Sequence, residues 1–434
     1  MLLVYTHKIT PRVTYVFKQI CSRILGMEVA FTSKVEDFVA HNSIKLSYSK
    51  KPLGNELFVQ SHELLFENGL SDIDINVQQW EETKCFFKVG DKSIIPFDIF
   101  AASFYLLSRY EEYLPHVKDE YGRFPAHESL AYKNNFLLKP VVDIWAYKFL
   151  EILKEKYSGV NYKLNDFSFQ PIFDVPVAYR FKNKGTVRTV FGAARDLVRF
   201  DFNEILNRFR VLLSLKRDPY DTFKWIVNVH KTKHIKPLFF FLLADFSNHD
   251  RNISYKNVEF RSLIKSVADY ADVGLKVSFE ALSDIQLLSK EKKRIEGIIN
   301  KPLAYTRNSF NKINLPNSYR NLIDLEIKED FTLGYISELG FRAGTCTTFY
   351  FYDLDYEIQT PLRLSPFFIM DYLILKEDKQ DQLKQMIAIL DEVKKVNGKM
   401  ITIFHNYTFS EDKKWDGFKK LYIEFIKHVT LGQD

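Results

Sequence analysis

From residue 168 onward the sequence alternates between short apolar runs and segments with helical periodicity. The apolar runs predict strands at 168–175, 237–243, 273–279, 303–307, 331–335 and 400–404. The intervening segments carry apolar residues at helical spacing, as in Leu383, Met386 and Leu390. Strands that alternate with helices form a parallel sheet, and six or seven such units predict an α/β barrel, either closed or incomplete.

The preceding residues predict a second, smaller α/β unit. A short strand is expected at Leu2–Tyr5, and helices are expected after Pro11, at Ala101–Leu114 and from Lys139 to Leu153. We see no catalytic set of residues in this half. The chain is therefore divided into an N-terminal α/β domain of unknown role at 1–164 and a barrel domain at 165–434.

The composition excludes several classes of protein. The 434 residues are 46% hydrophobic, which is typical of a globular chain, and the net charge of +6 is too modest to indicate nucleic-acid binding. Three widely spaced cysteines do not form a zinc motif. The first residues lack the apolar core of a secretory signal, and no apolar run is long enough to cross a bilayer, so we expect a cytoplasmic protein.

One segment concentrates positive charge. Residues 180–217 hold ten Lys or Arg against three acidic residues. A solvated helical face explains such a pattern, and so does a surface for phosphate or an anionic membrane. Both interpretations stay open at the level of the sequence.

Several chemically active residues fall at or near the carboxyl ends of predicted strands. They are Asp174, Asp245, Lys276, Arg307 and His405. In α/β folds these ends meet at one face, so we expect the side chains to converge. An acid, a histidine and an arginine at one rim can support general acid–base hydrolysis. Alternatively, Asp174 caps the next helix and His405 is structural.

The chain resembles the polysaccharide deacetylases, which are metal-dependent carbohydrate esterases. Asp174 on the first barrel strand, Phe341-Arg-Ala-Gly344 and His405-Asn406 look like three of their motifs. Segments 97–115, 121–125, 139–145, 319–323, 340–346 and 351–353 are similar to a two-domain bacterial branch with an uncharacterised N-terminal domain. The resemblance implies a distorted (β/α)7 barrel and an acetylated amino sugar or polysaccharide precursor as the carbohydrate partner.

The resemblance also implies roles for individual residues. Asp174 matches the catalytic base, Arg342 the arginine that orients this base, and His405 the general acid. Three further residues, Arg307, Asn308 and Asn406, are expected to contact the sugar.

The family's metal, zinc or a similar divalent ion, is held by an aspartate and two histidines. Here the matching positions are Pro176, Lys276 and Ser309, none of which is a good ligand, so we expect no metal cofactor. A rebuilt metal site would need other side chains as ligands. The neighbouring candidates are Asp245, His249, Glu280 and Asp284.

These residues favour a deacetylase-like protein of bacterial surface or capsular glycan metabolism that has lost metal-dependent activity. The alternatives are a non-catalytic carbohydrate-binding or glycan-assembly protein, and a metal-independent amide or ester hydrolase that uses Asp174 and His405.

We further predict that Lys276 replaces the metal's charge and lies within about 4 Å of an Asp174 oxygen. A buried carboxylate without a compensating charge would otherwise cost several kcal/mol. The alternative is that Lys276 points outward along the surface, as lysines usually do.

Overall fold

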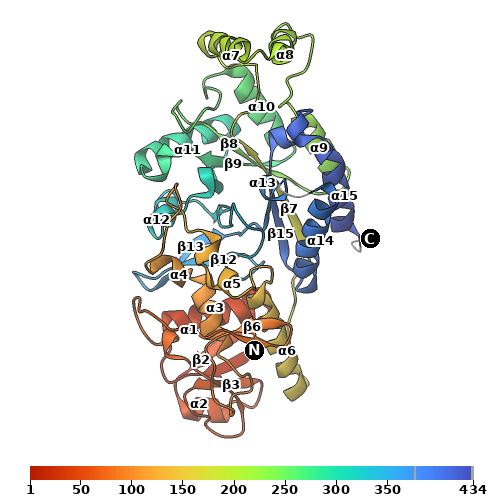
Figure 1. Cartoon of the computed structure of the whole chain (residues 1–434). Helices are drawn as coiled ribbons and strands as arrows, with labels where there is room; N and C mark the ends of the chain where they lie inside the picture. Colours follow the sequence, from red (N-terminus) through yellow and green to blue (C-terminus); the bar gives the residue numbers. More distant parts are fainter. Residues whose placement is uncertain (376–377, 432–434) are drawn as a thin grey trace.

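The computed structural model describes residues 1–375 and 378–431 as two α/β units joined end to end (Figure 1). Helix α6 (Val141–Lys156) ends the first unit and strand β7 (Ser168–Val175) begins the second. The predicted boundary at residue 164 falls in the segment between them and stays a prediction, because one hydrophobic core continues through both units.

The N-terminal unit is built on a four-stranded parallel sheet with the strand order β2-β1-β3-β4. The strands are β1 (Leu2–Tyr5), β2 (Val29–Thr32), β3 (Lys45–Ser49) and β4 (Leu57–Gln60), and a small hairpin joins β5 (Gln78–Trp80) to β6 (Thr83–Cys85). The other helices are α1 (Pro11–Phe17), η1 (Lys18–Ile24), α2 (Val35–Ala40), α3 (Ile99–Leu107), α4 (Tyr110–Tyr113) and α5 (Leu130–Lys133).

The single helix predicted at Ala101–Leu114 is wrong, because the chain breaks at Arg109. This residue has a positive φ of 56°. Its buried guanidinium contacts Glu111 Oε1 at 2.7 Å and Glu112 Oε1 at 2.8 Å. Residues two apart do not face each other on a continuous helix, so the break lets one arginine reach both carboxylates.

The C-terminal unit is organised around a sheet with the order β12-β13-β11-β10-β9-β8-β7-β15-β14 in the described part of the chain. All its pairs are parallel except β12 with β13. The strands after β7 are β8 (Leu238–Leu242), β9 (Asp272–Val277), β10 (Tyr305–Asn308), β11 (Glu329–Asp330), β12 (Phe349–Asp353), β13 (Ile358–Leu364), β14 (Ile369–Met370) and β15 (Lys399–His405).

Helices are interspersed with these strands; most of them cover the outside of the sheet, whereas the first two project away from it (Figure 1). They are α7 (Thr186–Val198), α8 (Phe202–Leu212), α9 (Phe223–Lys231), α10 (Val258–Ala268), α11 (Ile285–Ile299), α12 (Asn317–Asp324), α13 (Asp371–Ile374), α14 (Lys379–Lys395) and α15 (Phe418–Thr430). None of the described helices has the length and apolar content needed to cross a bilayer.

Two predictions about this sheet are wrong. The strand expected at 331–335 lies earlier, at β11, because the Asp330 carboxylate accepts hydrogen bonds from the backbone and hydroxyl of Thr332 and turns the chain there. No strand was predicted between residues 335 and 400, yet this stretch contains the antiparallel pair β12 and β13. In β13 buried and exposed residues alternate, and this strand signal is masked by Pro361 in the sequence.

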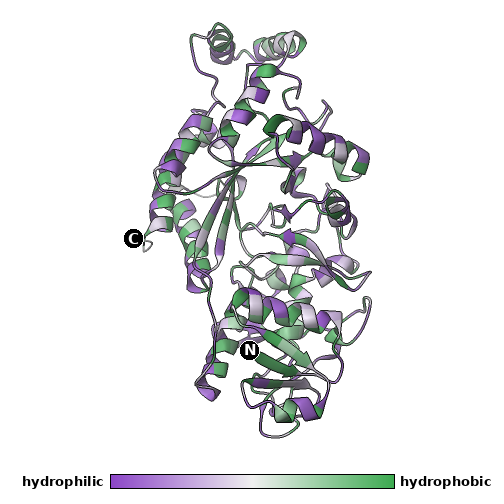
Figure 2. Cartoon of the chain, turned by 180° about the vertical axis from the view of Figure 1, so that it is seen from behind, coloured by the Kyte–Doolittle hydropathy of each residue, from purple (hydrophilic) through white to green (hydrophobic). Residues whose placement is uncertain are grey.

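The period of two along each strand separates an outer from an inner face. Phe173 and Phe239 pack outward in the main core, whereas Ile172, Phe240 and Ile403 pack inward in a smaller cluster. Phe331 and Phe367, from loops across the sheet, complete this inner cluster. The sheet therefore curls around this inner cluster, the apolar floor, which confirms the predicted α/β fold with a distorted barrel. Figure 2 shows the chain from behind, coloured by hydropathy.

Candidate functional site

Four polar side chains lie next to the apolar floor, on the side nearer the carboxyl ends of their strands. Asp174 of β7 is in register with His405 of β15, and Lys276 of β9 is in register with Arg307 of β10. In three of these strands the residue two positions earlier faces the same way: Ile172, Gly274 and Ile403. The alternation that places apolar residues in the floor thus also directs these four polar groups inward.

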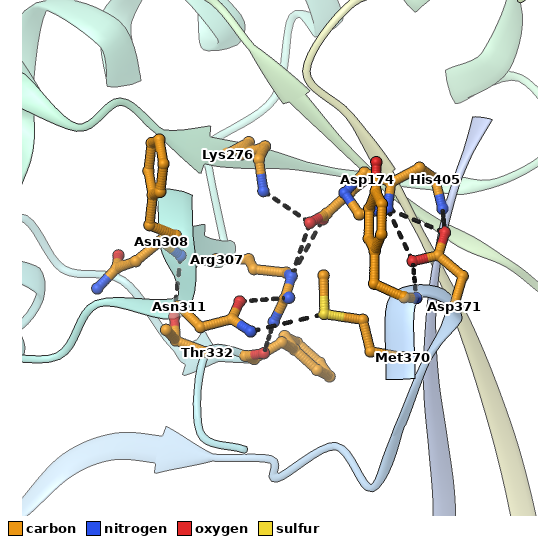
Figure 3. A network of polar contacts seen from close by, with 12 residues as sticks. Asp174, Lys276, Arg307, Asn308, Asn311, Thr332, Met370, Asp371 and His405 are labelled. Carbon is orange, nitrogen blue, oxygen red and sulfur yellow. Dashed lines mark hydrogen bonds and ion pairs between the residues drawn. The ribbon is translucent and has the colours of Figure 1, made fainter. Parts of the chain in front are cut away.

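Asp174 is the centre of this group and has no exposed surface. Its Oδ2 accepts a hydrogen bond from Lys276 Nζ at 2.6 Å and another from Arg307 Nε at 3.0 Å (Figure 3). Burial by itself raises the pKa of Asp174, but the nearby Arg307 and Lys276 cations outweigh burial and hold the pKa well below its usual range. Asp174 is therefore an ionised carboxylate held by two cations.

Lys276 has the position expected for it, so the predicted ion pair with Asp174 is confirmed. Strand β8 lies between β7 and β9, and the long lysine stem bridges the gap of two strand spacings. Only 6% of Lys276 is exposed. Burial lowers the pKa of Lys276 against the attraction of Asp174, and the positive charge of Arg307 lowers it further.

Arg307, expected to contact a sugar, is instead fully buried and directed at protein groups. Besides Asp174, it donates from Nη1 to the carbonyl of Phe331 at 2.8 Å and from Nη2 to the side chain of Asn311. All three guanidinium nitrogens have partners, which makes Arg307 a fixed support for the carboxylate.

His405 forms a second polar pair with Asp371, a residue that the sequence reasoning missed. The Asp371 carboxylate accepts from His405 Nδ1 at 2.9 Å, from the His405 backbone N–H at 2.7 Å and from the Thr408 hydroxyl. This pairing places the proton of a neutral imidazole on Nδ1 and leaves Nε2 as the basic nitrogen. The signal for Asp371 was present, because Phe368-Ile-Met-Asp371 is an apolar run that ends in an acid, as at Asp174.

Aromatic side chains surround His405. The Tyr407 ring stacks on the imidazole with 4.8 Å between ring centroids, and the Tyr372 ring meets it edge-on at 5.3 Å. The two tyrosine hydroxyls lie 2.9 Å apart, and Trp415 packs against Tyr372. Tyr372 is 37% exposed, so this aromatic rim is open to solvent on one side.

Arg342 does not have the predicted contact with Asp174. Its Nε and Nη2 form a bidentate ion pair with Glu112 at 2.8 Å and 2.7 Å, and Nη1 donates to the carbonyl of Gly334. Glu112 belongs to the N-terminal unit, so Arg342 joins the two units. Arg307, not Arg342, is the arginine that contacts Asp174.

The remaining predicted residues hold loops or backbone. Asn406 Nδ2 donates to the carbonyls of Val177 and Tyr220, and Asn308 Nδ2 donates to the carbonyl of Lys312. Both side chains are buried, and their amide nitrogens are already paired with backbone carbonyls. Pro176 follows β7 directly, and Ser309 is buried just after β10.

The residues present do not fit the divalent metal that the resemblance implies. At the three positions that match its ligands, Pro176 has no donor atom, Ser309 is a neutral hydroxyl and Lys276 is a cation paired with Asp174, so a metal ion here would meet the positive charges of Lys276 and Arg307. In the described part of the chain, no group of three or more His, Cys, Asp or Glu side chains is arranged to hold a metal ion.

The candidates for a rebuilt metal site have other partners. Asp245 pairs with Arg294 at 2.8 Å, His249 pairs with Glu280 at 3.3 Å, and Asp284 caps helix α11. Each of these groups is satisfied by a neighbouring residue or by a helix end.

The arrangement limits the chemistry that this centre can perform. Asp174 is a poor general base, because its low pKa and its two cationic partners oppose proton uptake. His405 is oriented by Asp371 and keeps a small exposed surface.

Comparisons with known proteins give a partial match. Residues 2–158 match a family of unknown function, DUF7033. No curated protein matches the chain.

Similar solved structures include a proposed polysaccharide deacetylase from Mycobacterium smegmatis, with 12% identity and a TM-score of 0.40, covering 62% of this chain and 86% of that one. The polysaccharide deacetylase Bc1974 from Bacillus cereus has 12% identity and a TM-score of 0.30, with 62% and 87% covered. Wild-type BA3943 from Bacillus anthracis, a CE4 family pseudoenzyme, has 9% identity and a TM-score of 0.30, with 61% and 63% covered. These TM-scores are low, so our description of the fold rests on the strand order of this chain.

Proposed function

We propose that this protein is a polysaccharide deacetylase-like protein of bacterial surface or capsular glycan metabolism that binds acetylated carbohydrate without metal-dependent deacetylation. The observation that carries the proposal is the ion pair between Lys276 and Asp174, with Nζ 2.6 Å from Oδ2. Lys276 lies where the resemblance expects a metal-binding histidine.

The chemistry of hydrolysis supports the loss of metal-dependent activity. Water is a weak nucleophile at neutral pH unless a Lewis acid or a free base activates it. Asp174 is fully buried and paired with two cations, so it does not reach a substrate as a free base.

The aromatic rim supports a carbohydrate ligand. Tyr372 and Tyr407 lie beside His405, and the buried Trp415 packs against both tyrosines. Rings with polar tips can stack on the apolar face of a sugar and donate hydrogen bonds to its hydroxyls.

The test combines a binding and a turnover assay on the full chain. Acetylated amino-sugar oligomers should bind by calorimetry, and no acetate should be released with added zinc, cobalt or nickel. Tyr372→Ala should weaken binding about tenfold, whereas Tyr356→Ala, an exposed tyrosine elsewhere, should leave it unchanged. Acetate release that depends on metal would refute the proposal.

A variant with metal ligands at the three expected positions is the positive control. Pro176→Asp, Lys276→His and Ser309→His together should gain zinc binding, which adds about 2.7 kcal/mol at 100 times the dissociation constant. The unchanged chain should show no such stabilisation.

A metal-independent hydrolase is the second candidate, and the pairing of His405 with Asp371 favours it. In that case an activated acetyl ester should be hydrolysed in the presence of a chelator. His405→Gln should abolish this activity while the protein stays folded. Activity that survives this substitution would exclude His405 as the reacting group.

A further inference from the structure

Helices α7 and α8 form a hairpin that projects from the end of the molecule opposite the N-terminal unit (Figure 1). The two helices are held together by an ion pair between Asp196 and Arg208, both of which are buried. Arg188 fastens the hairpin to the body by donating to the carbonyls of Arg251 and Asn252. The hairpin thus has a defined orientation.

This hairpin exposes large apolar side chains. Phe191 is 72% exposed, Phe200 is 78% exposed and Leu215 is 75% exposed. Other exposed members of the group are Val190, Val198 and Phe202. Scattered apolar residues are normal on a protein surface, but a concentration of this kind on one projection marks an interaction site.

The backbone supports this interpretation at Phe200. Its φ is 55°, in the left-handed region where glycine or asparagine is usual at the end of a helix. A bulky residue with this backbone conformation is strained, and because the ring is exposed, its burial does not offset the strain. The aromatic side chain is therefore better explained by a contact outside this chain than by folding.

Positive charge accompanies the apolar residues. Arg199, Arg210 and Lys216 are exposed, and no ion pair is found for them within the described residues. Amphipathic helices with this combination lie in the interface of an anionic membrane. Both hairpin helices, of 13 and 11 residues, are too short to span one.

A cavity of about 580 Å³ lies between the hairpin and the body. Of the six basic residues in its lining, Arg180, Arg195 and Arg208 form ion pairs with acidic neighbours, whereas no ion pair is found within the described residues for Lys184, Arg188 and Arg251. Burial, and then the positive charge of Arg188, lower the pKa of Lys184 to about 8. Such an excess of cations in a concave site attracts an anion that carries more than one charge-assisted acceptor.

We propose that the hairpin at 186–215 docks on an anionic membrane, with its apolar side chains in the lipid interface and a lipid phosphate in the basic cavity beneath it. A second copy of the chain is a poorer occupant, because two equally basic hairpins repel each other. An anionic lipid supplies both the apolar medium and the missing negative charge. The proposal does not depend on glycan binding.

The main experiment is vesicle flotation of the full chain. Phosphatidylcholine vesicles with and without phosphatidylglycerol are compared at about 0.05 M and about 0.5 M NaCl. Binding to anionic vesicles at low salt should exceed binding to neutral vesicles at least about tenfold, and high salt should remove most of this difference.

A matched pair of double variants locates the surface. Arg199→Glu with Phe200→Asp should reduce flotation about tenfold or more. Val117→Asp with Lys118→Glu changes an adjacent exposed apolar residue and cation in the N-terminal unit, and should leave flotation unchanged. Equal effects of the two double variants would overturn the proposal.

The cavity is tested separately. Lys184→Gln with Arg251→Gln should lower the preference for anionic over neutral vesicles about fivefold or more, with the melting temperature kept as a check on folding. Equal flotation on the two vesicle types by the wild type would overturn the lipid assignment. The lipid assignment would also be overturned if the wild type were a dimer without lipid and Arg199→Glu with Phe200→Asp made it monomeric. A third contrary outcome is thermal stabilisation by inorganic phosphate without any binding to vesicles.

Discussion

Two basic regions of this molecule contain the same residue types, lysine and arginine, but one region is buried and the other is exposed. At the strand ends, Lys276 and Arg307 are buried and share the carboxylate of Asp174. On the hairpin, Arg199 and Arg210 are exposed and no ion pair is found for them in the described part of the chain. The first set compensates a charge inside the protein, and the second is available to a charge outside it.

This difference shows that burial, more than charge, decides how much a cation contributes to the stability of the fold. The buried pair of Lys276 and Asp174 and the exposed pair of Lys236 and Asp272 have the same separation of 2.6 Å. Water screens the exposed pair, whereas removal of one buried partner leaves a charge without compensation. The following predictions, from the largest to the smallest effect on the free energy of unfolding, test this contrast.

Removal of the buried cation should have the largest effect. Lys276→Met should lower the free energy of unfolding by about 3 kcal/mol, because Asp174 loses one of its two cations. Lys236→Met should cost less than about 0.5 kcal/mol. Urea unfolding measures both.

A double-mutant cycle separates coupling from general damage. In an Asp174→Asn background, Lys276→Met should cost about 2 kcal/mol less than in the wild type. Strictly additive effects would show that the two side chains are not coupled.

The ion pair between the two units should come next. Arg342→Met should cost about 2 kcal/mol, since Glu112 keeps Arg109 as a partner but loses the bidentate contact. Lys427→Met, which breaks an exposed helical pair with Glu424, is the control and should cost less than about 0.5 kcal/mol. If Arg342→Met cost no more than the control, the ion pair of Arg342 would not stabilise the contact between the two units.

Acidic pH should reduce the contribution of Asp174 to the free energy of unfolding. Its folded-state pKa lies below the unfolded value of about 3.9, so its stabilisation is present above that pH and is lost as the pH falls through the folded-state pKa. Each unit of separation between the two pKa values corresponds to about 1.4 kcal/mol. The stability difference between wild type and Asp174→Asn should therefore shrink as the pH falls from about 5 to about 2. A difference that stays constant over this range would contradict the lowered pKa.

The hairpin should show the smallest effect on stability. Arg199→Glu with Phe200→Asp should change the free energy of unfolding by less than about 0.5 kcal/mol, because both side chains are exposed. The same urea curves used for Lys276→Met measure it. A loss comparable to that of Lys276→Met would mean that the hairpin is part of the folded core and would erase the contrast between the regions.

Much of the fold follows from local sequence, and the failures have local causes. The strands around Asp174, Lys276 and His405 lie within two residues of their predicted positions, since each is a buried apolar run with a clear end. The hairpin of β12 and β13 was missed because Pro361, which lies within β13, is more typical of a loop. Asp371 was missed because the strand before it, β14, has only two residues, so the short apolar run that ends at Asp371 did not stand out as a strand.

The sequence by itself determined which residues face inward and at which strand ends they lie. The period of two along β7, β8 and β15 places Ile172, Phe240 and Ile403 in the floor, and the same period directs Asp174 and His405 above it. It also determined that residues 180–217 are basic.

Only the tertiary structure decided the partners of these residues. Arg307 rather than Arg342 contacts Asp174, and Asp371 holds His405, because strand order and register bring together residues more than thirty positions apart. Exposure of the hairpin was likewise undecided, since amphipathic helices bury their apolar face in most proteins and a sequence does not show whether another part of the chain covers it. Pairing and exposure depend on distant segments, and local pattern carries no information about their distance in space.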